Sequence, residues 1–123
     1  MTPLLVALVG GLGAASRFVV DGWFRGRWAG RLPLATIAIN VSGSLVIGAL
    51  AGALATGALP VTWYTVAATG FCGGYTTFST AMVETVRLAQ AGDRRRAVAN
   101  ALGTLVLTVA AASLGYLATA AWT

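Results

Sequence analysis

Long uncharged hydrophobic stretches, separated by short polar segments, dominate the sequence. Residues 32–59, 61–83 and 97–123 contain no Asp, Glu, Lys or Arg, and residues 4–16 begin a fourth such stretch. A hydrocarbon core of about 30 Å needs about 20 apolar helical residues to cross it. The pattern therefore predicts an all-α integral membrane protein with four transmembrane helices, at residues 3–23, 33–56, 61–91 and 95–121.

The third predicted helix contains a segment that a membrane helix rarely carries. Residues 69–80 include three glycines and five Ser or Thr residues in mid-span. The pair Gly73-Gly74 followed by Thr76-Thr77 predicts a break, which would free backbone carbonyls able to bind a small cation. The alternative is a tightly packed glycine face whose hydroxyls bond to their own helix. The residues alone leave both interpretations open.

Composition limits the chain to a single four-helix membrane domain over residues 1–123. Only 9% of its residues are charged and 58% are hydrophobic. A bundle this small can enclose a pore only with a second copy, so a dimer is the minimal assembly. Cys72 is the single cysteine and histidine is absent, which excludes an internal disulfide and disfavours a His/Cys metal site.

The arginines cluster in two of the three connections between the predicted helices. Those between the first and second helices are Arg25, Arg27 and Arg31, and those in the connection between the third and fourth helices or at the adjoining helix ends are Arg87, Arg94, Arg95 and Arg96. With four spans both connections fall on one side, which the positive-inside rule places in the cytoplasm. Both termini are then expected outside. The net charge of +5 indicates contact with anionic lipid and no nucleic-acid partner.

Polar side chains recur at helical spacing on the second and fourth predicted helices. They are Thr36, Asn40 and Ser44 on the second helix and Asn100, Thr104 and Thr108 on the fourth. Hydroxyl and amide groups can donate hydrogen bonds to a dehydrated anion without trapping it as a fixed positive charge would. For each residue alone, hydrogen bonding between helices explains the pattern equally simply. As a set, they favour a polar track.

Among the ionisable residues of the predicted helices, Arg17 and Glu84 are the ones that we expect to lie inside the membrane. Intramembrane charge is rare enough to suggest a function, yet both lie towards helix ends, where pairing or snorkelling is an alternative. Asp21 and Asp93 are expected to pair with nearby arginines. No nucleophile, base and orienting group converge in the sequence, so we expect no enzyme.

Three motifs resemble those of the Fluc/CrcB family of small bacterial fluoride channels. Residues 70–80 match its third-helix motif, which is highly specific, and residues 10–17 and 38–43 are similar to its first- and second-helix signatures. The resemblance spans the whole chain. It implies an antiparallel dimer in a bacterial inner membrane, with two pores along its interfaces, through which cytoplasmic fluoride leaves passively.

The resemblance also implies roles for individual residues. A structural sodium ion, which is not transported, would be bound by backbone carbonyls of Gly73 and Thr76. The fluoride path would include Asn40, Phe78, Thr104 and Thr108. Positions at a pore end or vestibule would be Arg17, Glu84, Thr36 and Asn100.

Two positions depart from the family pattern. A second pore phenylalanine is expected where this chain has Ala81, and a fourth-helix tyrosine where it has Asn100. The one-sided arginines also differ from the balanced loops of a subunit that inserts both ways. These departures favour a subunit that pairs with a similar, oppositely oriented chain over a homodimer. A small multidrug-type transporter is a further alternative, but it needs an embedded carboxylate in its first helix, where only Asp21 is present.

Overall fold

The computed structural model describes residues 1–30 and 32–122, which are helical with short connections and form no strand. Its elements are α1 (Thr2–Arg25), α2 (Leu34–Ala55), α3 (Val61–Tyr64), the π-helical segment η1 (Thr65–Cys72), α4 (Gly73–Tyr75), α5 (Phe78–Gln90) and α6 (Arg94–Ala120). The first, second and fourth predicted helices are confirmed, with ends within two residues of those expected. Each is long and apolar enough to cross a membrane.

The third predicted helix is divided into α3, η1, α4 and α5. The first three follow one another directly, whereas α4 ends at Tyr75 and α5 begins at Phe78. The eight-residue π-helical stretch was not predicted from the sequence. Wider π-helical turns are rare and often mark functional positions in membrane and soluble helices alike.

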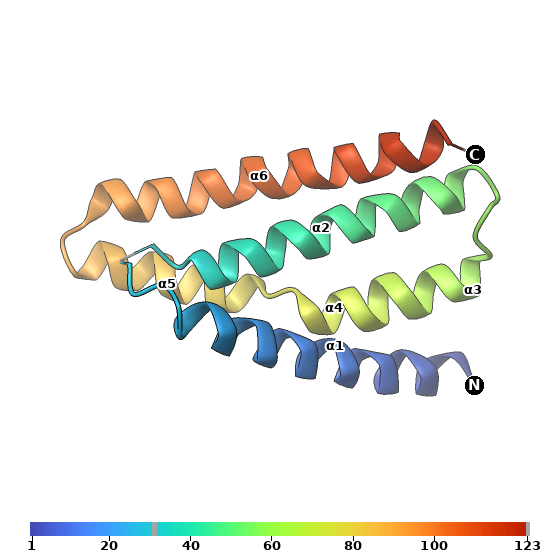
Figure 1. The fold of residues 1–123 in the computed structure, drawn as a ribbon, viewed down its shortest axis with the longest axis horizontal. Helices are drawn as coiled ribbons and strands as arrows, with labels where there is room; N and C mark the ends of the chain where they lie inside the picture. The colour runs from blue at the N-terminus through green and yellow to red at the C-terminus, as the bar shows by residue number, and fades with distance from the viewer. Residues whose placement is uncertain (31, 123) are drawn as a thin grey trace.

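The helices run along a common long axis, with successive spans in opposite directions (Figure 1). Both termini and the connection between α2 and α3 lie at one end. The connections from α1 to α2 and from α5 to α6 lie at the other. The described loop arginines therefore share one end, as the even number of spans predicts, while Arg31 lies outside the described residues. We call this end the basic end.

Glycines bring α2 and α6 into backbone contact. A methyl group built on Gly48 would overlap the carbonyl oxygen of Ala112, and one built on Gly115 would overlap that of Leu45. In lipid, which supplies no hydrophobic drive between helices, such close packing is a main source of association. The predicted role of small residues in tight helix contacts is therefore confirmed for this pair, which forms the most extensive helix contact.

A second glycine seam joins α1 to η1 and α4. Side chains added at Gly13 or Gly74 would overlap the carbonyl oxygens of Phe71 and Gly10, respectively. The buried interior is correspondingly thin and made mostly of small side chains, and its largest fully buried ones include Ile39 and Asn100. Most large apolar side chains face outward, as expected of a protein whose surface contacts lipid or another subunit.

Candidate anion path and cation-binding carbonyls

The backbone between α4 and α5 is extended at two residues in mid-span. Thr76 has φ −79° and ψ 162°, and Thr77 has φ −150° and ψ 118°. The Thr77 side chain caps α5 by accepting a hydrogen bond from the Thr80 amide at 3.2 Å. A hydroxyl at this position satisfies one of the amides that a helix start leaves without a partner. We call Thr76 and Thr77 the extended segment.

Asn40 of α2 binds this extended segment through both ends of its side-chain amide. Its Nδ2 donates to the carbonyl oxygen of Thr77, and its Oδ1 accepts from the Thr77 amide, each at 2.8 Å. Asn40 is 8% exposed and Thr77 is buried. The side chain thus replaces, for both backbone groups, bonds that a hydrophobic environment cannot supply. Because an amide nitrogen carries two hydrogens, one donor of Asn40 remains for another acceptor.

These bonds alter the surroundings of the two carbonyls expected to bind a cation. In an unbroken α-helix the Thr77 amide would donate to the carbonyl of Gly73, and the Thr80 amide to that of Thr76. Here the first donates to Asn40 and the second to the Thr77 hydroxyl. Gly73 is exposed on the surface of the subunit and Thr76 is partly exposed. Both carbonyls therefore lose the donors of a regular helix at an accessible place.

A cavity of about 440 Å³ lies beside the extended segment, between α2, α5 and α6. Its lining brings together all four residues expected on the anion path, which are Asn40, Phe78, Thr104 and Thr108. The Thr108 hydroxyl donates to the carbonyl of Thr104 at 2.8 Å. By contrast, the Thr104 hydroxyl oxygen is buried with no hydrogen-bond partner among the described residues. A buried hydroxyl without a partner carries a desolvation cost and is free to bind a ligand.

Phe78 and Ala81, which both line this cavity, differ in their exposure. Phe78 is 79% exposed and projects from the first turn of α5, whereas Ala81, one turn later, is 4% exposed. Asn100 does not line the cavity. It is 2% exposed and donates from Nδ2 to the hydroxyl of Thr85 at 2.8 Å, which ties α6 to α5. The polar track on α6 therefore begins in this structure at Thr104.

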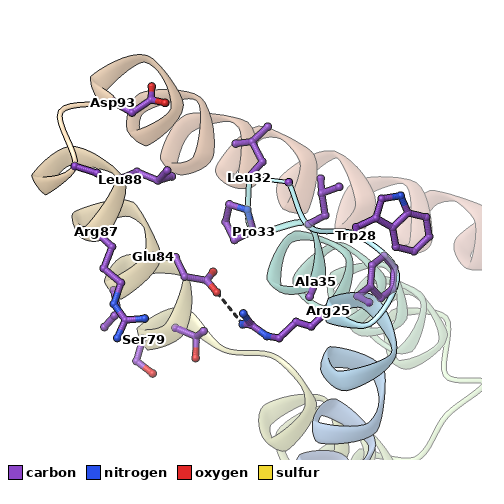
Figure 2. A pocket seen from close by; sticks show the side chains of 16 residues that line it. Arg25, Trp28, Leu32, Pro33, Ala35, Ser79, Glu84, Arg87, Leu88 and Asp93 are labelled. Atoms are coloured by element: carbon purple, nitrogen blue, oxygen red, sulfur yellow. Dashed lines mark hydrogen bonds and ion pairs between the residues drawn. The ribbon is translucent and has the colours of Figure 1, made fainter.

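Glu84 lies apart from this cavity, at the basic end. It lines a second cavity of about 770 Å³ bounded by the end of α1, the start of α2 and α5. Its Oε1 accepts a hydrogen bond from Nη2 of Arg25 at 3.1 Å, and Arg25 also binds Asp21 at 2.7 Å. Figure 2 shows Arg25 reaching across to Glu84. The expected pairing of Asp21 is confirmed.

The other expected vestibule residues are not gathered with Glu84. Thr36 is 2% exposed in the first turn of α2, and Arg17 is partly buried on α1. Neither lines either cavity. Arg17 makes no ion pair with any residue in the described ranges 1–30 and 32–122. Asp93 pairs with Arg96, as expected of an interfacial acid.

Known proteins resemble this chain over nearly its whole length. Residues 4–116 match the family described as CrcB-like protein, Camphor Resistance (CrcB). The chain belongs to the CrcB family. One relative is the "Fluoride-specific ion channel FluC 1" of Leifsonia xyli subsp. xyli, which is 52% identical over 119 residues, 94% of this chain and 86% of that protein.

Two further relatives carry similar names. The "Fluoride-specific ion channel FluC 2" of Cutibacterium acnes is 45% identical over 116 residues, covering 94% of each protein. The "Fluoride-specific ion channel FluC" of Syntrophotalea carbinolica is 45% identical over 111 residues, 89% of this chain and 90% of that protein. The family resemblance expected from the sequence motifs is confirmed. The relatives are named as ion channels, in agreement with the expectation that this CrcB-family chain is no enzyme.

Sequence reasoning missed two contacts that shape the site. The first is the paired hydrogen bond between Asn40 and Thr77, which are 37 residues apart. The second is the link from Arg25 to Glu84 across 59 residues. The spacing of Asp21 and Arg25 by four helical positions indicated their ion pair. Nothing in the sequence indicates the contact of Arg25 with Glu84.

Proposed function

We propose that the chain is a subunit of a fluoride-specific channel that lets cytoplasmic fluoride leave the cell down its gradient. The observation that carries the proposal is the cavity in which Asn40, Phe78, Thr104 and Thr108 meet beside the extended segment. The names of the relatives support the choice of ion. They lend no support to the multidrug-type transporter alternative.

The residues of this cavity suit a small, strongly hydrated anion. One Asn40 hydrogen and the unpartnered Thr104 hydroxyl can replace water around fluoride. The positive edge of the Phe78 ring supplies a further weak attraction. Larger anions such as chloride accept weaker hydrogen bonds from the same donors. The cavity therefore favours fluoride because its hydrogen-bond donors take the place of the water molecules that the ion gives up.

We propose that a second subunit completes the path in an antiparallel dimer. Phe78 is 79% exposed, so the cavity in a single subunit has an open side where the ring projects. If lipid filled that side, the polar path would be in direct contact with hydrocarbon, which cannot form hydrogen bonds with an anion. A second, oppositely oriented chain covers this face and contributes its own helices.

A structural sodium ion at the centre of this dimer is part of the proposal. Gly73 and Thr76 carbonyls have lost the donors of a regular helix and lie at accessible positions. Carbonyl oxygens from two subunits would supply a hard cation with the ligands it prefers. The residues present thus fit such an ion. Dialysis of the assembled protein into sodium-free lithium or potassium buffer is expected to dissociate it, and unchanged assembly and flux would contradict the sodium site.

The basic end is proposed to face the cytoplasm of a bacterial inner membrane. The connection between α2 and α3 carries no arginine, whereas arginines lie within or beside both connections at the other end. A cysteine placed at Ala58 in a Cys72→Ser background should react with an impermeant thiol reagent added outside intact cells. Equal reaction from both sides of the membrane would indicate dual insertion and remove the main argument for an oppositely oriented partner chain.

The test of the proposed function is ion flux from vesicles that contain the purified, assembled channel. Fluoride efflux should be fast and chloride efflux should remain at the level of protein-free vesicles. Equal chloride flux, or fluoride flux no faster than that of protein-free vesicles with every candidate partner present, would refute the proposal. Weak fluoride flux that a second, similar chain strengthens would favour the paired-subunit form of the channel.

A further inference from the structure

Arg25 joins two carboxylates that belong to different helices. Its Nε donates to Oδ2 of Asp21 on α1 at 2.7 Å, and its Nη2 donates to Oε1 of Glu84 on α5 at 3.1 Å. The second oxygen of Glu84, Oε2, is buried and has no hydrogen-bond partner within the described residues. Glu84 therefore depends on one guanidinium for the compensation of its charge.

Glu84 shares its cavity with the hydroxyl residues that begin α5. Ser79 and Thr80 line the same 770 Å³ space, and the Thr77 hydroxyl donates to that of Thr80 at 3.0 Å. Thr77 is in turn bound to Asn40, which lines the smaller cavity on the other side of α5. Polar groups thus run continuously from the cavity of Glu84 to the proposed anion path.

A bare carboxylate at this place would oppose the entry of an anion. Like charges repel most strongly where protein and lipid reduce the screening by water, and a charged group that lines a cleft dominates its potential. The pairing with Arg25 removes this obstacle. The side chain of Arg25 is 58% exposed, so the ion pair itself adds little to folding stability.

We propose that Arg25 is a positioning residue of the anion path, which neutralises Glu84 and holds its carboxylate towards α1 so that fluoride can enter past Ser79 and Thr80. This inference rests on the proposed fluoride channel. It adds a role for a residue outside the sequence motifs that led to that proposal, and it makes the mouth at the basic end depend on one ion pair.

The charged groups around Glu84 identify Arg25 as the neutralising partner. The cavity is lined by Arg25 from α1, by Glu84 and Arg87 from α5, and by Asp93 from the turn before α6. The segment of α2 that faces it contributes no ionisable side chain. Arg87 forms no ion pair with any residue that the structure describes, and Figure 2 shows its side chain directed away from Glu84, towards Ser79.

The experiment compares four variants of the assembled channel in fluoride-loaded vesicles, Arg25→Gln, Arg25→Gln/Glu84→Gln, Arg25→Lys and Arg87→Gln. Flux is measured for all variants in the same buffer. Protein-free vesicles give the leak of undissociated hydrogen fluoride, which is subtracted. Size-exclusion chromatography checks that each variant is assembled.

Arg25→Gln should lower fluoride flux by roughly tenfold, the lower end of the effect of a charge-lined cleft on local ion concentration. The double variant should recover flux, because it no longer carries an uncompensated carboxylate beside the path. Arg25→Lys should keep most of the flux, since the cation beside Glu84 is retained, and Arg87→Gln should lower flux less than Arg25→Gln does.

Three outcomes would overturn the inference. Equal losses in Arg25→Gln and Arg87→Gln would mean that the arginines only attract anions at long range. A double variant as slow as Arg25→Gln would mean that Glu84 is not the obstacle. Normal flux in Arg25→Gln would remove the role of the pair while leaving the proposed channel intact, whereas absent flux in the unmodified protein would refute both.

Discussion

Glycine allows close backbone packing both in the α2–α6 pair and in the third span, but only the third span is also interrupted. Along α2 and α6, glycines let two regular helices touch through their backbones. In the third span, Gly74 packs against the backbone of α1 at Gly10. The chain then becomes extended at Thr76 and Thr77, whose backbone groups are bound by side chains, above all by Asn40. Small residues by themselves thus accompany close packing, whereas the interrupted helix held by side chains is the region where we propose that ions bind.

The largest effect is expected from a substitution that disrupts the packing of α2 against α6. Gly48→Val places a branched side chain against the carbonyl of Ala112, where even a methyl group would overlap. Overpacking of this kind costs about 3 kcal/mol or more in the worst cases, so little folded protein should be recovered from membranes. Gly22→Val is the matched control, since a side chain there meets open space. Thermal denaturation in detergent gives the comparison, and equal midpoints would contradict the packing argument.

The second-largest effect is expected when the hydrogen bonds between α2 and the extended segment are removed. Asn40→Ala removes both hydrogen bonds to Thr77 and leaves a buried amide and carbonyl without partners. Each such group costs about 1–3 kcal/mol, and the anion path loses a donor, so both stability and fluoride flux should fall. Ser16→Ala is the control, because that hydroxyl bonds only to its own helix at Leu12. Normal flux in Asn40→Ala would show that the extended segment holds its shape without this residue.

Two substitutions on α5 test the aromatic contribution to the cavity beside the extended segment. Phe78→Ile should abolish fluoride flux while the subunit stays folded and assembled, because the ring edge is lost from a position that packing within the subunit does not depend on and an apolar side chain remains there. Ala81→Phe should raise the flux of a lone-chain assembly if the 440 Å³ cavity accepts the added ring. Vesicle flux measures both, and insensitivity to both changes would mean that selectivity lies elsewhere.

The smallest effect is expected when the unpartnered hydroxyl group of Thr104 is removed. Thr104→Val keeps the shape of the side chain and removes a group that has no partner in the described part of the chain. Flux should fall roughly two- to fivefold, as expected for one neutral hydrogen bond of about 0.5–1 kcal/mol, with no loss of thermal stability. In Thr65→Val, where the hydroxyl donates to the carbonyl of Val61 one turn earlier in the same span, flux should be unchanged. A stability loss confined to Thr104→Val would indicate a structural role instead.

The sequence predicted the regular parts of this fold well, because hydrophobic length and charge are local properties. Residues 32–59 and 97–123 lack charge and contain α2 and α6 almost to their ends. The resemblance to the family, together with the polar spacing on the second and fourth helices, likewise led to Asn40, Phe78, Thr104 and Thr108, which the structure places around one cavity. Their roles in conduction stay predictions.

Other features depend on contacts that no local pattern contains. The π-helical η1 lies in a stretch where the residues predicted a helix but not its wider turns. Asn100 looked equivalent to Thr104 by helical spacing, yet it faces Thr85 instead of the cavity. Arg25 was assigned only to the basic connection, although its guanidinium spans two helices. Each outcome is decided by which neighbour a side chain meets after packing.

The contact between Asn40 and Thr77 also bears on how the chain enters the membrane. Synthesis proceeds from the N-terminus, so α2 has already emerged when the ribosome delivers the third span. That span has an extended segment that lipid alone would not tolerate, and the three helices long and apolar enough to cross a membrane are α1, α2 and α6 among the described residues. Asn40 can then act as a built-in insertion partner, so that α2 and the third span settle in the bilayer as one hairpin.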